Sequence, residues 1–155
     1  MALFDKIFSA LKGDAPTEVH ARPDALQVAV GALLVEAAAR DDVFDAAESA
    51  AITRLLAERF QLSSEATAQL VKAAEEAKHG SVELYGFVRK VAREMDEAQR
   101  VEVIEMLWEV ALADGVLDAH EDAMIRKVAG LLYVSDFDRG AARRRVREKL
   151  GLATA

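Results

Sequence analysis

An acidic pattern, Asp-x-x-x-Asp-x-x-Glu, occurs twice in this chain, and its two copies lie 73 residues apart. The first copy consists of Asp41, Asp45 and Glu48, and the second consists of Asp114, Asp118 and Glu121. Further identities continue in the same register, at Val28/Val101, Val30/Val103, Leu34/Leu107, Glu36/Glu109, Ala38/Ala111, Val43/Val116, Ala46/Ala119, Ala50/Ala123 and Ile52/Ile125. The chain is therefore best described as two related halves, and its fold must repeat one structural unit.

The composition favours helices in both halves. The chain is rich in alanine, contains only two prolines and shows no sustained alternation of apolar and polar residues, so an all-α fold is predicted. Residues that commonly cap helices precede the apolar patterns, and they are Asp45, Ser63, Ser81, Asp96, Asp118 and Ser135. These signals predict seven main helices, over residues 24–40, 45–60, 64–78, 82–94, 97–113, 118–133 and 136–149.

Two of these helices are expected at the centre of the fold. Residues 24–40 and 97–113 are apolar on most helical faces, which predicts a buried pair related by a pseudo-two-fold axis. The helix over residues 82–94 has no counterpart in the repeat, so we expect it to bridge the two halves.

The residues before the repeat are predicted to form a separate N-terminal segment. An apolar stripe marks a short amphipathic helix, and residues 13–23 are turn-prone. We therefore predict an N-terminal amphipathic helix and linker over residues 1–23 and a single helical domain over residues 24–150. The amphipathic helix is expected to bind a membrane surface weakly, or to dock on its own domain or in a partner's groove.

Composition and motifs limit the function classes. The chain has no cysteine, which excludes disulfides and thiolate metal sites, and its net charge of −7 disfavours nucleic-acid binding. Neither a secretory signal nor a membrane-spanning stretch is recognised, so a cytoplasmic location is expected. No nucleophile elbow, phosphate-binding loop or zinc-protease motif occurs, which favours a protein that is not an enzyme.

The acidic pattern admits two interpretations. Asp45 and Asp118 lie at helix starts with Glu48 and Glu121 three residues later, which is the spacing of a capping box. Asp41 and Asp114, however, are expected at helix C-termini, where the helix dipole disfavours a negative charge, so a ligand role is the alternative. Carboxylate oxygens suit Ca²⁺, Mg²⁺ or Mn²⁺. The pattern lacks half of the ligands of an EF-hand loop, so any cation site here is not an EF-hand.

Two other groups of charged residues need an explanation. Glu36 and Glu109 repeat on apolar helices, so they are either additional ligands or partners of an arginine such as Arg54 or Arg126, and pairing is the favoured interpretation. The last predicted helix is strongly basic, through Arg139, Arg143, Arg144, Arg145, Arg147 and Lys149. A solvated face paired with acidic neighbours is the simpler explanation, and contact with anionic lipid or an acidic partner is the alternative.

Three segments of the chain resemble the TerB family, namely ADGVLDAHE, its counterpart RDDVFDAAE in the first half, and LWEVA, which precedes the second copy. Members of this family are associated with tellurite resistance, and related domains occur in DjlA-type co-chaperones. The resemblance covers about residues 24–150. It implies an all-helical domain without catalytic activity, acidic clusters that bind divalent cations, and a stress-linked role at or near the inner membrane surface, with protein partners. The metal positions carried over are Asp41, Asp45, Glu48, Asp114, Asp118 and Glu121. Asp42 stands where glycine is usual. The alternative is a plain protein–protein interaction domain with acidic helix caps and no metal.

Overall fold

The computed structural model describes residues 23–38, 46–77, 81–117 and 119–152. This part of the chain contains seven α-helices and no strand, which confirms the all-α prediction. The helices are α3 (Ala25–Ala38), α4 (Ala46–Phe60), α5 (Ser64–Ala77), α6 (Ser81–Glu94), α7 (Glu97–Ala111), α8 (Ala119–Leu131) and α9 (Asp136–Lys149). The predicted N-terminal helix and nearly all of its linker lie outside the described residues, so the division of the chain near residue 23 stays a prediction.

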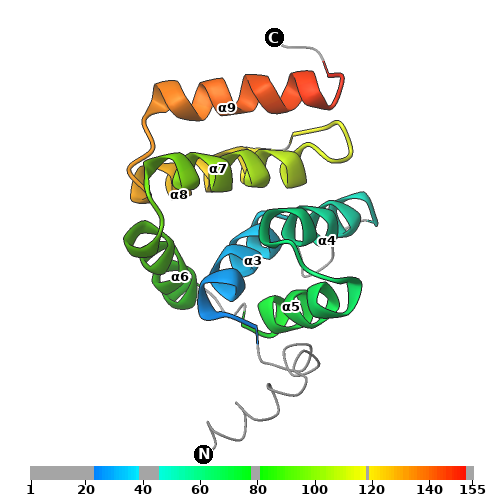
Figure 1. Cartoon of the computed structure of the whole chain (residues 1–155). Helices are drawn as coiled ribbons and strands as arrows, with labels where there is room; N and C mark the ends of the chain where they lie inside the picture. Colours follow the sequence, from blue (N-terminus) through cyan, green and yellow to red (C-terminus); the bar gives the residue numbers. More distant parts are fainter. Residues whose placement is uncertain (1–22, 39–45, 78–80, 118, 153–155) are drawn as a thin grey trace, which may run out of the picture.

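Helices α3 and α7 form the centre of the molecule, as expected from their apolar sequences (Figure 1). Their buried side chains point in nearly every direction around the helix axis, because neighbouring helices cover most faces of both. Trp108 of α7 is the largest of the fully buried side chains, with 1% of its surface exposed.

The two halves pack on each other reciprocally. Helix α4 of the first half packs against α7, and its counterpart α8 in the second half packs against α3. Helix α6 contacts both α3 and α8, so the prediction that it bridges the halves is confirmed. Helix α5 covers α3 and α4, and α9 covers α7 on the other side of the molecule (Figure 1).

Helices α3 and α5 approach each other closely at Gly31. A Cβ atom built at Gly31 would lie 3.0 Å from the Cβ of Ala74 and 3.5 Å from Cδ1 of Leu56. A separation of 3.0 Å is shorter than carbon atoms tolerate at van der Waals contact. The absence of a side chain at Gly31 therefore sets the distance between α3 and α5.

Several predicted caps are present. Asp96 forms a complete capping box with Gln99, the hydroxyl of Ser135 accepts the backbone N–H of Asp138, and that of Ser63 accepts the N–H of Ala66. Such bonds satisfy amide groups that the first helical turn leaves without partners. Asp45 and Asp118 lie outside the described residues.

Two predicted helix ends were wrong by two residues. Helix α7 ends at Ala111 rather than 113, because the chain turns after Leu112, whose carbonyl accepts the N–H of Gly115 at 2.8 Å. Helix α8 ends at Leu131 rather than 133, because Tyr133 adopts a left-handed conformation with a φ of 61°. Both ends are fixed by local backbone hydrogen bonds that the apolar pattern does not record.

Candidate functional site

The second copy of the acidic pattern, residues 114–121, is here called the second acidic turn, and the structure describes all of it except residue 118. Asp114 has a defined place in this turn. Its Oδ1 accepts the backbone N–H of Val116 at 3.0 Å, and Gly115 between them has a φ of +85°. An aspartate that accepts a bond from the residue two positions later stabilises a tight turn. Asp114 is exposed and lies beyond the C-cap Leu112, so it does not occupy the unfavourable helix-end position that was expected from the sequence.

Glu48 and Glu121 occupy equivalent places in the two halves. Each lies in the first turn of its helix, α4 or α8, and each is buried, with 6% and 4% of its surface exposed. A carboxylate in such surroundings requires hydrogen bonds or charged partners, and both residues have interactions within the structure. The repeat therefore conserves a buried carboxylate at the start of each of these helices.

The other predicted ligands, Asp41, Asp45 and Asp118, lie outside the described residues. Among the residues that are described, no three histidine or carboxylate side chains come together as a metal-ligand set. The oxygen donors of Asp114 and Glu121 suit a hard divalent cation, and the repeated pattern adds Asp118 to this set.

Glu109 of α7 is the centre of a second group of charged residues. Its Oε1 lies 3.1 Å from Nη2 of Arg54 on α4, and its Oε2 lies 2.6 Å from Nζ of Lys149 at the end of α9. The Glu109 side chain is 5% exposed, whereas those of Arg54 and Lys149 are 43% and 59% exposed. The predicted pairing of Glu109 with Arg54 is confirmed, and Lys149 is an additional partner that the sequence did not indicate.

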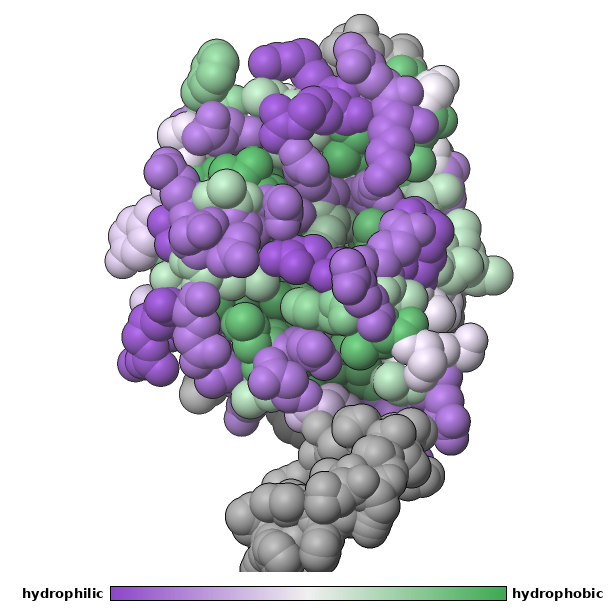
Figure 2. All heavy atoms as spheres, in the orientation of Figure 1, coloured by the Kyte–Doolittle hydropathy of each residue, from purple (hydrophilic) through white to green (hydrophobic). Residues whose placement is uncertain are grey.

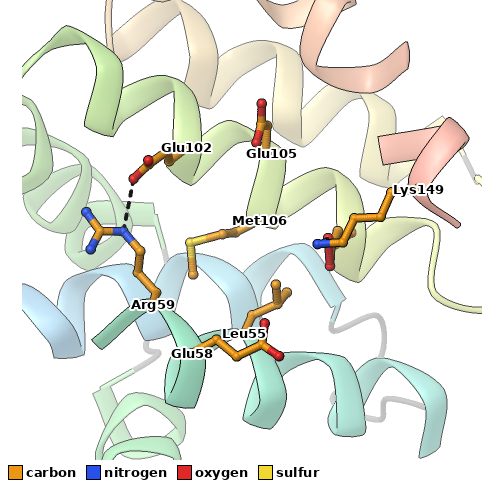
Figure 3. Close-up of a pocket in the computed structure, with 8 residues that line it drawn as sticks. Leu55, Glu58, Arg59, Glu102, Glu105, Met106 and Lys149 are labelled. Carbon is orange, nitrogen blue, oxygen red and sulfur yellow. Dashed lines mark ion pairs between the residues drawn. The ribbon is translucent and has the colours of Figure 1, made fainter. Parts of the chain in front are cut away.

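A cavity of about 340 Å³ lies beside this group, between α4, α7 and the end of α9 (Figure 3). Met106 and Leu55 lie among its lining residues, and Nε of Arg59 pairs with Oε1 of Glu102 at 3.1 Å near its edge. Three glutamates of α7, at 102, 105 and 109, line it together with Glu58 of α4. Sequence analysis missed this gathering, although the spacing of three and four residues places the three glutamates on one helical face.

The basic residues of α9 are largely engaged by acidic or aromatic neighbours. Arg145 pairs with Glu105 of α7, where Nε and Nη2 lie 2.7 Å and 2.5 Å from Oε2. Arg139 pairs with Asp136, and the guanidinium of Arg143 lies 5.5 Å from the ring centroid of Trp108. Hydrophilic side chains predominate over α9 in Figure 2, with some apolar side chains visible between them. These contacts confirm the interpretation of α9 as a solvated face paired with acidic neighbours.

The Glu109 group leads to a test of stability. We expect the double substitution Arg54→Met and Lys149→Met to lower the free energy of unfolding by about 2 kcal/mol, because it leaves a buried carboxylate without its two cations. Removing one partner of a fully buried pair costs about 3–5 kcal/mol, and the partial exposure of these two cations reduces the expected effect. Urea denaturation monitored by circular dichroism measures the change.

Two further variants serve as controls for that test. Lys90→Met with Arg126→Met removes two cations of surface i,i+4 pairs, changes the net charge equally, and should alter stability by less than about 1 kcal/mol. Adding Glu109→Met to the Arg54 and Lys149 substitutions should restore most of the loss. If this triple variant is as unstable as the double variant, the charged group does not account for the effect.

Comparisons with known proteins support one family. Residues 27–144 match the family model described as Tellurite resistance protein TerB. No curated protein and no solved structure matches the chain. No helix in the described ranges is long and apolar enough to cross a membrane.

Proposed function

The chain belongs to the TerB family, whose model matches residues 27–144. We propose that it is a non-enzymatic helical module that binds a divalent cation at its repeated acidic turns. It would serve as a tellurite-resistance-type stress-response adaptor, or an adaptor associated with the cell envelope. The proposed partners are proteins, the proposed location is the cytoplasm with peripheral contact at the inner membrane, and nucleic acid is not a proposed ligand.

The observation that carries the cation proposal is the repeated burial of Glu48 and Glu121. A glutamate whose only role is to reach back to an N-cap amide has no need to be buried. Both are buried at the same point of the two halves, and in the sequence each follows two aspartates of the repeated pattern. In the second acidic turn the first of these aspartates, Asp114, is exposed and therefore accessible to an ion from solvent.

The ligand set follows from the repeat. Asp41, Asp45 and Glu48 would supply the first site, and Asp114, Asp118 and Glu121 the second. All six donors are carboxylates, which favours Ca²⁺, Mg²⁺ or Mn²⁺ over softer metals. The cation would neutralise the carboxylates and join each turn to the helix that follows it.

A protein-interaction domain without metal is the second candidate. The bond from the N–H of Val116 to Asp114 gives that side chain a structural role, and Glu48 and Glu121 have interactions within the protein. Under this alternative the pattern only shapes the turns and starts the helices.

Thermal unfolding with and without cation distinguishes the two candidates. At a cation concentration about a hundredfold above the Kd, binding to the folded state stabilises it by about 2.7 kcal/mol, which raises the Tm of a domain of this size by roughly 5–10 °C. We expect Ca²⁺ or Mn²⁺ to produce this increase in the wild type. Isothermal titration calorimetry provides an independent measure of binding.

Two pairs of substitutions separate ligand roles from structural ones. Asp45→Ser with Asp118→Ser preserves capping ability, and Asp41→Asn with Asp114→Asn preserves side chains that form turns, so both double variants should keep their stability without cation to within about 1 kcal/mol. Both should lose the cation-dependent increase in Tm. A wild type that responds to no divalent cation beyond ionic-strength controls removes the metal proposal and leaves the interaction domain.

A further inference from the structure

A groove of about 390 Å³ lies between α6 and the C-terminal end of α8, and its lining includes no residue of the acidic pattern or of the Glu109 group. Apolar side chains form its floor, among them Val88, which is 2% exposed, and the half-buried Leu131. Tyr85 and Tyr133 line it while remaining 50% and 79% exposed. An accessible groove with an apolar floor and exposed aromatic residues is typical of a binding surface.

One face of α6 supplies an ordered row of groove residues. Tyr85, Arg89 and Arg93 are spaced by four, so they follow one another along the same side of the helix. The row is about 12 Å long, from eight residues at a rise of about 1.5 Å each. This length matches about two turns of a second helix lying alongside.

The two arginines of this row have no acidic partners in the described part of the chain. No ion pair or side-chain hydrogen bond involves Arg89 or Arg93 there, whereas Lys90 on the adjacent face of α6 pairs with Glu94 at 2.7 Å. They are the charged residues that line the groove, in a chain whose net charge is −7. The groove thus presents local positive charge that is complementary to an acidic ligand.

Tyr133 occupies a backbone position that disfavours its side chain. It lies just after α8 with a φ of 61°, where glycine is the usual residue. The N–H of Val134 donates to the carbonyl of Ala129 at 2.9 Å and closes the helix end around it. A bulky residue in this conformation is strained, and strained residues cluster at functional sites.

We propose that this groove binds an acidic amphipathic helix of a partner protein. Apolar residues of the partner would lie on Val88 and Leu131, and its Asp or Glu side chains would face Arg89 and Arg93. The described residues offer no strand edge that an extended peptide could join, and a helix laid between two helices is an established mode of recognition. Tyrosine and arginine are also the residue types that contribute most to binding at interfaces.

Selection from a displayed peptide library tests the proposal with the full chain. The library presents 18-residue amphipathic helices with a fixed apolar stripe and randomised flanking positions, and selection in EDTA excludes any contribution from divalent cations. We expect the recovered peptides to be enriched in Asp and Glu and to bind more weakly as the salt concentration rises. Fluorescence anisotropy with the best peptide then gives its Kd.

Variants of the groove locate the binding site. Arg89→Glu with Arg93→Glu should weaken binding by about tenfold or more, whereas Lys72→Glu with Arg144→Glu, an equal charge change at exposed cations outside the groove, should leave it unchanged. Tyr133→Gly should keep or raise the Tm, because glycine suits the left-handed position, and should also weaken binding. A loss of affinity with no loss of stability separates a recognition role from a structural one.

Several outcomes overturn the proposal. Recovery of no peptide, of peptides without acidic enrichment, or of peptides that bind the Arg89→Glu and Arg93→Glu variant equally well would each do so. Flotation with vesicles of phosphatidylglycerol, if dependent on the two arginines while no peptide binds, assigns the groove to anionic lipid instead. A dimer that these substitutions dissociate in analytical ultracentrifugation assigns it to a second copy. None of these results bears on the cation proposal, because the groove contains no residue of the acidic turns.

Discussion

Replacing Trp108 with alanine is expected to lower the free energy of unfolding by about 3–5 kcal/mol, the usual range for truncation of a large buried aromatic residue. Trp108 is 1% exposed on the central helix α7, and Arg143 of α9 lies against its ring. Alanine would leave a cavity between these helices that they fill only partly. Urea denaturation followed by circular dichroism measures the loss.

A matched variant, Trp108→Phe, tests whether volume accounts for the effect. The Nε1 of Trp108 is buried and has no hydrogen-bond partner among the described residues, so phenylalanine removes an unsatisfied donor while keeping an aromatic ring. We expect it to be less destabilising than alanine by at least about 2 kcal/mol. Equal losses for the two variants would show that the aromatic volume retained by phenylalanine contributes nothing, which would contradict the packing explanation.

Introducing a side chain at Gly31 is expected to have the second largest effect. Gly31→Leu should lower the free energy of unfolding by about 3 kcal/mol, the upper part of the range for overpacking a close-packed core. Even a Cβ atom at this position would lie 3.0 Å from that of Ala74, so α3 and α5 must separate to admit a larger group. The same denaturation experiment measures the change.

Exchanging the two small residues tests this explanation directly. Gly31→Ala with Ala74→Gly transfers one methyl group from α5 to α3 and removes the short contact. We expect Gly31→Ala to be less harmful, or more stabilising, when Ala74→Gly is present than when it is absent, with a coupling of about 1 kcal/mol. Strictly additive effects would show that the two residues do not restrict each other and that the helix spacing has another cause.

The sequence predicted the helices and the central pair because long apolar segments leave few alternatives. Residues such as Leu33 and Leu107 must be buried on any helical face, so the identity of the central helices follows from composition and repeat alone. The helix ends were less predictable. Tyrosine seldom ends a helix in a left-handed conformation, so Tyr133 gave no signal of the end of α8.

The charged sites were predictable only where the repeat marked them. A charged partner was predicted for Glu109 because a glutamate occurs at the equivalent position of both apolar helices, and Arg54 was one of the two arginines proposed as that partner. Lys149 was missed because its contact with Glu109 requires α9 to pack along α7. The row of Tyr85, Arg89 and Arg93 has a visible spacing, but its significance depends on α8 forming the opposite wall.

The reciprocal packing of the halves has a consequence for how the domain holds together. Because α4 rests on α7 and α8 rests on α3, each half supplies part of the apolar environment that the other half requires. We therefore expect that neither half folds stably without the other, because separating them would expose the apolar faces of α3 and α7. The two halves should accordingly unfold together in a single cooperative transition.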